Sequence, residues 1–135
     1  MRTFLTILIL TFFVTPVFAE EGEVDGKGLE CTSIENPLKY EPIYYHFENG
    51  IVYRHYVSDR TPLEIETKRL SKYITTVDFI KWAEWSLRHK LDRKTLELTA
   101  STEFWDCQVI SPLEIEVALD KRIEELEEEM KDNKI

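Results

Sequence analysis

The sequence lacks every short motif that marks a common catalytic or nucleotide-binding site. It has no nucleophile elbow, no HExxH helix, no P-loop and no glycine-rich dinucleotide turn. Histidine is also scarce, because only His46, His55 and His89 are present among 135 residues. These absences predict that the protein is not an enzyme and needs no cofactor.

The chain is short of basic residues, with 17 Lys and Arg against 26 Asp and Glu and a formal net charge of -9. Nucleic acids and anionic lipid surfaces repel such a chain unless its bases are concentrated in one patch. The basic cluster visible in the sequence, Arg88-His89-Lys90 with Arg93-Lys94, is too small to provide one. We therefore expect neither a nucleic acid nor an anionic lipid surface as a partner.

The N-terminus has the pattern of a cleaved export signal. Arg2 supplies a positive start, residues 4–14 an apolar run, and Pro16 breaks the segment before the small Ala19. The run is shorter than the roughly 20 apolar residues that a spanning helix needs. The sequence thus predicts a signal peptide over 1–19, no membrane span after its cleavage, and an exported protein in the periplasm or outside the cell.

Cysteine is limited to Cys31 and Cys107, and neither belongs to a CxxC motif. Outside the reducing cytoplasm two such residues pair, so we expect a structural disulfide between them. The pair would join the first and last strands of the region between them, which requires these strands to lie side by side.

The residues after the signal divide into three parts. Residues 20–28, with acids and glycines, predict a flexible acidic leader, and 29–110 predict a disulfide-stapled β domain. The fold class is mainly β: a small antiparallel up-and-down meander that closes into a roughly eight-stranded barrel, followed by a C-terminal α-helix. The expected strands span 29–34, 43–48, 51–57, 63–69, 72–80, 82–91, 95–101 and 104–110.

Asn49-Gly50 gives the strongest local signal, because this pair suits a two-residue type I′ hairpin turn. The resulting register places Tyr44, His46, Tyr53 and His55 on one face, as a candidate surface binding stripe. His46 and His55 would be near enough to share a metal if a third ligand joined them, but no motif supplies one, and no metal site is predicted. The opposite, core face carries Ile43, Tyr45, Phe47, Val52 and Tyr56.

The last 25 residues, 111–135, change character and predict a charged amphipathic helix over 112–131. Ser111 suits the N-cap and Pro112 the first helical position. Apolar residues recur at helical spacing along one stripe: Leu119, Ile123, Leu126 and Met130. The stripe can dock on the β domain or pair with another copy, so we expect a monomer or a weak dimer through this helix.

Several segments resemble small exported bacterial β proteins that carry one disulfide. They are Gly28-Leu29-Glu30-Cys31, Ile80-Lys81-Trp82, the run over 91–98, and Trp105-Asp106-Cys107. The resemblance spans about 28–109 and implies a fold without a known activity. A more distant likeness is to the periplasmic inhibitors of c-type lysozyme, which are single-disulfide β-barrels. Residues 70–73 lack the glycine of their Ser-Gly-x-x-Tyr loop, so no inhibitory residue is carried over.

Two functions follow as expectations. The first is a binding protein whose partner is a protein or an envelope component, since a strong negative charge favours basic surfaces, lysozyme-like enzymes included. The second is a lipocalin-like carrier of a small apolar ligand, because the β region is rich in aromatic residues. A filled interior with an exposed aromatic patch favours the binding protein, and a cavity lined by Tyr and Trp favours the carrier.

Overall fold

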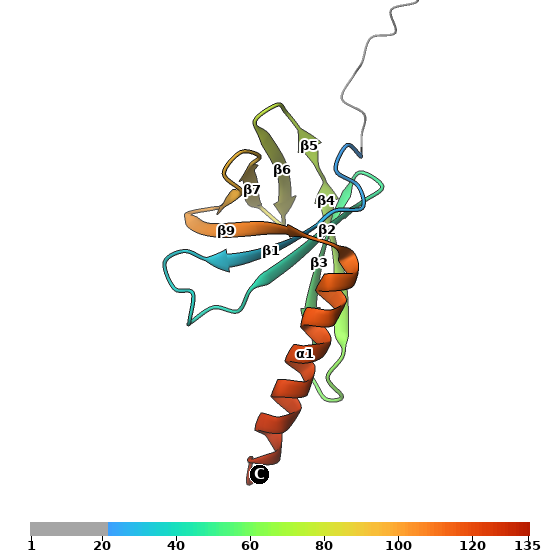
Figure 1. Ribbon diagram of the computed structural model, residues 1–135, viewed down its shortest axis with the longest axis vertical. Coiled ribbons are helices and arrows are strands. Elements are labelled where there is room, and N and C mark those ends of the chain that lie inside the picture. The colour runs from blue at the N-terminus through green and yellow to red at the C-terminus, as the bar shows by residue number, and fades with distance from the viewer. Residues whose placement is uncertain (1–21) are drawn as a thin grey trace, which may run out of the picture.

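The computed structural model describes residues 22–135, so the predicted signal peptide over 1–19 lies outside the described residues. The described chain forms one antiparallel sheet and a C-terminal helix, α1 (Pro112–Lys131) (Figure 1). The strands are β1 (Gly28–Ser33), β2 (Ile43–Glu48), β3 (Ile51–Val57), β4 (Ile65–Lys72), β5 (Ile74–Thr75), β6 (Phe79–Glu84), β7 (Leu87–Asp92), β8 (Glu97–Ala100) and β9 (Glu103–Ile110).

The sheet curls into a nearly closed barrel, as the sequence predicts. Its order is β4-β3-β2-β1-β9-β8-β7-β6-β5, so β1 pairs with both β2 and β9. The two ends of this order, β4 and β5, are separated in the chain only by Tyr73 and form one bent strand. Across the seam between β4 and β6, the Ala83 N–H donates to Ser71 Oγ at 2.8 Å. Counting β4 and β5 as one strand gives the eight expected.

The disulfide joins the strands that the sequence places together. Cys31 of β1 lies directly opposite Cys107 of β9, with their Cα atoms 4.0 Å apart. Both cysteines are buried in the core. The predicted disulfide and the neighbouring first and last strands are therefore confirmed.

Two of the expected strands are wrong in their limits. The strand expected over 72–80 contains a turn at 76–78, where the Thr76 side chain accepts a hydrogen bond from the Phe79 N–H at 3.0 Å. The strand expected over 82–91 contains the tight turn between β6 and β7, where Trp85 has a φ of 56°. Both turns lack Gly and Pro, and their Val and Trp side chains are exposed at the tips. Because the residues in these turns are of types that favour strands, the sequence pattern predicts continuous strands there.

The leader expected over 20–28 is described from residue 22 onward. Residues 22–27 form a turn at one end of the barrel in which Val24 is buried. The Asp25 carboxylate accepts hydrogen bonds from the Tyr73 hydroxyl at 2.7 Å and from the Gly50 N–H at 3.0 Å. These contacts hold the segment because they satisfy polar groups beside the apolar core.

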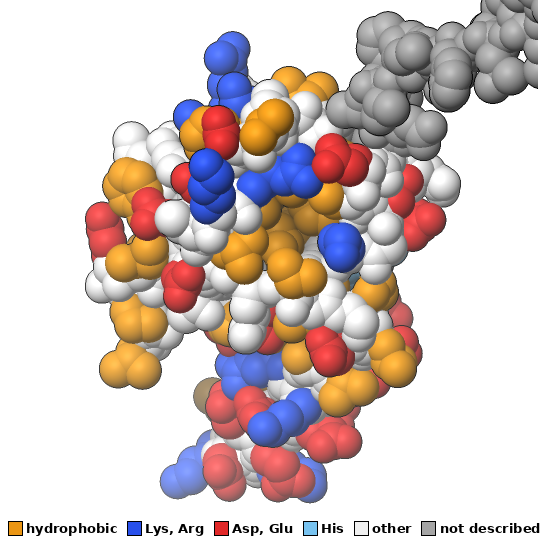
Figure 2. Space-filling view, turned by 45° about the horizontal axis from the view of Figure 1, so that its top comes forward, with side chains coloured by type: hydrophobic (Ala, Val, Ile, Leu, Met, Phe, Trp, Pro, Cys, Tyr) orange, Lys and Arg blue, Asp and Glu red, His pale blue; other side chains and the backbone are white. Residues whose placement is uncertain are grey.

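α1 has the predicted limits and its first half packs on the outside of the barrel. A capping box at Ser111 and Glu114 starts the helix, and Ile115 and Leu119 are buried against the sheet. Gly28 permits this approach, because a Cβ there would lie 2.8 Å from Ile115 Cδ1. The second half projects past the barrel, and its charged side chains appear at the bottom of Figure 2. Over residues 22–135 no helix has the length and apolar character needed to span a bilayer.

Candidate functional site

Aromatic side chains in mutual contact fill the barrel interior. The Trp82 ring lies edge-on to Tyr45 and Phe47, with ring centroids 5.2 and 5.6 Å apart. Phe47 in turn meets Tyr73 at 5.1 Å, and His89 stacks on Trp82 at 5.5 Å. His89 is thus a core residue, and burial lowers its pKa. These aromatic side chains belong to the buried core of the barrel.

A charged cluster closes one end of this interior. Arg54 lies opposite Tyr45 in the β2-β3 register and so shares the interior face, on which the sequence predicts only Ile43, Tyr45, Phe47, Val52 and Tyr56. The Glu84 carboxylate, itself mostly buried, accepts from Lys68 Nζ at 3.0 Å and lies 3.5 Å from Arg54 Nη1. The cluster satisfies these charges where the core meets solvent.

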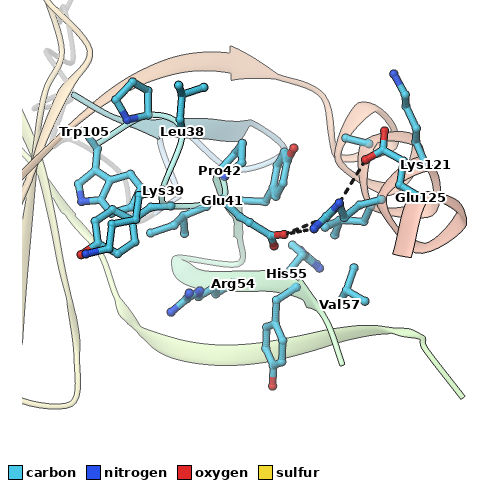
Figure 3. A pocket seen from close by; sticks show the side chains of 18 residues that line it. Leu38, Lys39, Glu41, Pro42, Arg54, His55, Val57, Trp105, Lys121 and Glu125 are labelled. Atoms are coloured by element: carbon cyan, nitrogen blue, oxygen red, sulfur yellow. Dashed lines mark hydrogen bonds and ion pairs between the residues drawn. The ribbon is translucent and has the colours of Figure 1, made fainter. Parts of the chain in front are cut away.

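A groove of about 1040 Å³ lies beside this end of the barrel (Figure 3). One wall is the β1-β2 loop, residues 37–42, another is the end of β3, residues 54–57, and the third is α1 through Leu119, Arg122 and Glu125. We call it the loop-helix groove. Trp105 also lines it, so the groove reaches the edge of the core.

The loop wall offers apolar surface next to charge. Leu38 is fully exposed and Tyr40 partly so. The Tyr40 ring lies 6.3 Å from that of Trp105, and Lys39 Nζ lies 5.2 Å from the Tyr40 centroid. Such a combination of an aromatic ring, an exposed aliphatic side chain and a cation suits protein recognition.

Arg122 holds the loop to the helix. Its Nε donates to Glu41 Oε1 at 2.8 Å, and its Nη1 lies 3.4 Å from Glu125 Oε2 (Figure 3). Glu41 and Glu125 are well exposed, so the clasp contributes about 0–1 kcal/mol. The clasp joins the loop wall of the groove to its helix wall.

The hairpin register that the sequence predicts is confirmed, and it brings the candidate stripe together. Tyr44 pairs with His55 and His46 with Tyr53, and the His46 and His55 rings are 5.6 Å apart. All four side chains are half-buried. Tyr44 and His55 line the loop-helix groove, whereas His46 and Tyr53 lie outside it.

Two stripe residues have altered pKa values. His55 Nδ1 is 2.9 Å from Thr67 Oγ1, and the pKa of His55 is lowered by burial and by the neighbouring His46. Burial, with the charge of Glu30, raises the pKa of Tyr44 to about 12. No cluster of three or more His, Cys, Asp or Glu suited to a metal occurs within residues 22–135.

Most residues of the loop-helix groove could not be predicted to lie together from the sequence. Glu41 and Arg122 are 81 residues apart, and no motif connects them. The bracketing prolines Pro37 and Pro42 mark a loop but not its destination.

No protein-family model, curated protein or solved structure matches this chain. The likeness to lysozyme inhibitors thus rests on two coarse features that the structure has, a single disulfide and a small β-barrel.

Proposed function

We propose that this is an exported, non-catalytic binding protein that recognises a segment of a partner protein in the loop-helix groove. The observation that carries the proposal is the position of this groove, outside a barrel whose interior is filled by its own aromatic side chains. Binding then takes place at the surface, and the disulfide-stapled barrel serves as the rigid support.

The shape and lining of the groove favour a protein segment over a small apolar ligand. Its volume is at the upper limit of ordinary small-molecule sites, which are about 300–1,000 Å³ and mostly enclosed. Leu38 and Tyr40 provide apolar anchors, and Arg54, Arg122 and Glu125 provide polar partners. Interfaces between proteins combine an apolar centre with a polar rim in this way.

Charge indicates what the partner is like. The chain has a net charge of -9, and α1, which forms one wall of the groove, is rich in glutamate. A partner with a basic surface is therefore attracted over distance and oriented towards this wall. A basic c-type lysozyme is one such protein. Loss of lysozyme activity on titration with the mature chain would identify it, and unchanged activity would remove it from consideration.

Site-specific photocrosslinking tests the groove. A photoreactive residue replaces Leu38 in the loop wall or, as the matched control, the exposed Glu97 of β8. In the exported fraction of the host, Leu38 should give one defined adduct of protein mass, which the added change Tyr40→Asp removes, while Glu97 gives none. Equal crosslinking from both positions, or an adduct insensitive to Tyr40→Asp, would refute recognition by the groove.

A further inference from the structure

A second surface lies on the outside of the barrel, at the seam where β4 and β5 meet β6. It is a hollow of about 450 Å³ lined chiefly by Lys72, Ile74, Lys81, Trp82, Arg88 and Lys90. We call it the seam hollow. None of these residues lines the loop-helix groove.

Strand pairing concentrates bases here that are scattered in the sequence. Lys81 of β6 lies directly opposite Lys90 of β7, and Arg88 opposite Ala83. Among residues 22–135, Lys72, Lys81, Arg88 and Lys90 have no carboxylate within ion-pair distance. Like charges opposite one another destabilise a sheet, so this arrangement favours a bound anion.

The acids nearest in sequence are already engaged. Asp78 lies 3.4 Å from Lys94 Nζ. Asp92 accepts hydrogen bonds from the N–H groups of Lys94 and Thr95. Neither carboxylate forms an ion pair with a base of the seam hollow.

The bases of the seam hollow are donors without acceptors. Ammonium and guanidinium groups donate hydrogen bonds and accept none. A ligand rich in acceptor oxygens, such as a phosphate group, complements this set.

Exposed apolar side chains lie around the same hairpins. Ile74 is 62 % exposed, Val77 at the β5-β6 turn 87 %, and Trp85 at the β6-β7 turn 86 %. Bases interspersed with exposed aliphatic residues and a Trp are typical of surfaces that rest on a lipid headgroup layer. We propose that this face binds the surface of an anionic bilayer, with lipid phosphates at the seam hollow.

The overall negative charge does not oppose this contact. The acidic second half of α1 projects from the opposite end of the molecule (Figure 1). At physiological ionic strength the screening length is about 8 Å, so charges farther away than this contribute little. The basic face therefore meets the membrane while α1 points away from it.

Vesicle binding by the full mature chain tests the proposal. The probes are phosphatidylcholine vesicles with and without phosphatidylglycerol, at low and high salt. Sedimentation should show binding to the anionic vesicles only, weakened by salt. Lys81→Glu with Lys90→Glu should lower the partition coefficient at least 25-fold, since each nearby base contributes about fivefold. Lys131→Glu with Lys134→Glu, the same charge change on the tail, should leave it nearly unchanged.

Tryptophan emission gives an independent readout. Trp82 and Trp105 are buried, so a blue shift on adding anionic vesicles reports Trp85 and should vanish in Trp85→Phe. If the variant with Lys81→Glu and Lys90→Glu fails to fold, the variant with Lys81→Gln and Lys90→Gln replaces it. The proposal is overturned by equal binding to both kinds of vesicle or by no binding at low salt. Saturable binding of soluble hexyl phosphate that abolishes vesicle binding would also overturn it, by assigning a small-anion site. None of these outcomes bears on the photocrosslinking test of the loop-helix groove.

Discussion

Reducing the disulfide should cost the protein a large part of its stability. Cys31 and Cys107 are 76 residues apart, so the bond closes a loop that contains nearly the whole barrel. In the chain-entropy account, a loop of this length is worth about 4–5 kcal/mol. A domain of this size is typically stable by about 5–15 kcal/mol, so the reduced protein should be marginal or unfolded at 37 °C.

Urea unfolding of the oxidised and the reduced chain measures this difference without any substitution. Both cysteines are buried, so reduction is carried out in the unfolded state before refolding under reducing conditions. With a slope of about 1–3 kcal/mol per molar urea, the midpoint should fall by roughly 2–4 M. A mass difference of two hydrogens between the samples is the control. A loss below about 1 kcal/mol would refute the reasoning, because the barrel would then close without its covalent link.

Three further predictions concern the core and its ends. Tyr73→Phe should lower the free energy of unfolding, measured by urea titration, by about 1–3 kcal/mol, because it removes the hydroxyl that is hydrogen-bonded to the turn over 22–27. Tyr53→Phe on the outer face is the control and should change this free energy little. Glu84→Gln should cost about 1–3 kcal/mol, since it leaves the partly buried Arg54 without its charged partner, and the more exposed Glu48→Gln should cost under about 1 kcal/mol. Burial holds the pKa of His89 below its ordinary value of 6.5, so the unfolded chain binds a proton more readily than the folded chain. The free energy of unfolding should therefore fall as the pH drops from 7 through 6.5. His89→Phe should flatten this fall in thermal melts, and an unchanged dependence of the melting temperature on pH would contradict the prediction.

Features set by neighbouring residues could be predicted from the sequence. Asn49 and Gly50 adopt the positive φ values of 51° and 73° that the hairpin turn requires, and the register beyond them follows from this turn. The helix limits follow from the Ser111 cap and the spacing of its apolar stripe. The cysteine pair required the first and last strands to meet, which fixed the closure of the barrel.

Features set by distant contacts could not be predicted. The seam hollow gathers bases from β4, β6 and β7, and their proximity depends on turns without Gly or Pro, such as that at Trp85. Of these bases, only Arg88 and Lys90, on either side of His89, are close together in the sequence. The loop-helix groove depends likewise on where α1 docks, which Gly28 and Ile115 decide through close packing.

The central claim is that the protein binds at its surface and that its interior is filled. Native mass spectrometry of the protein isolated from the exported fraction tests this most directly. We predict the mass of the chain from Glu20 onward less two hydrogens, with no small molecule retained. A constant added mass of small-molecule size, released only when the barrel unfolds, would contradict the claim and establish a carrier.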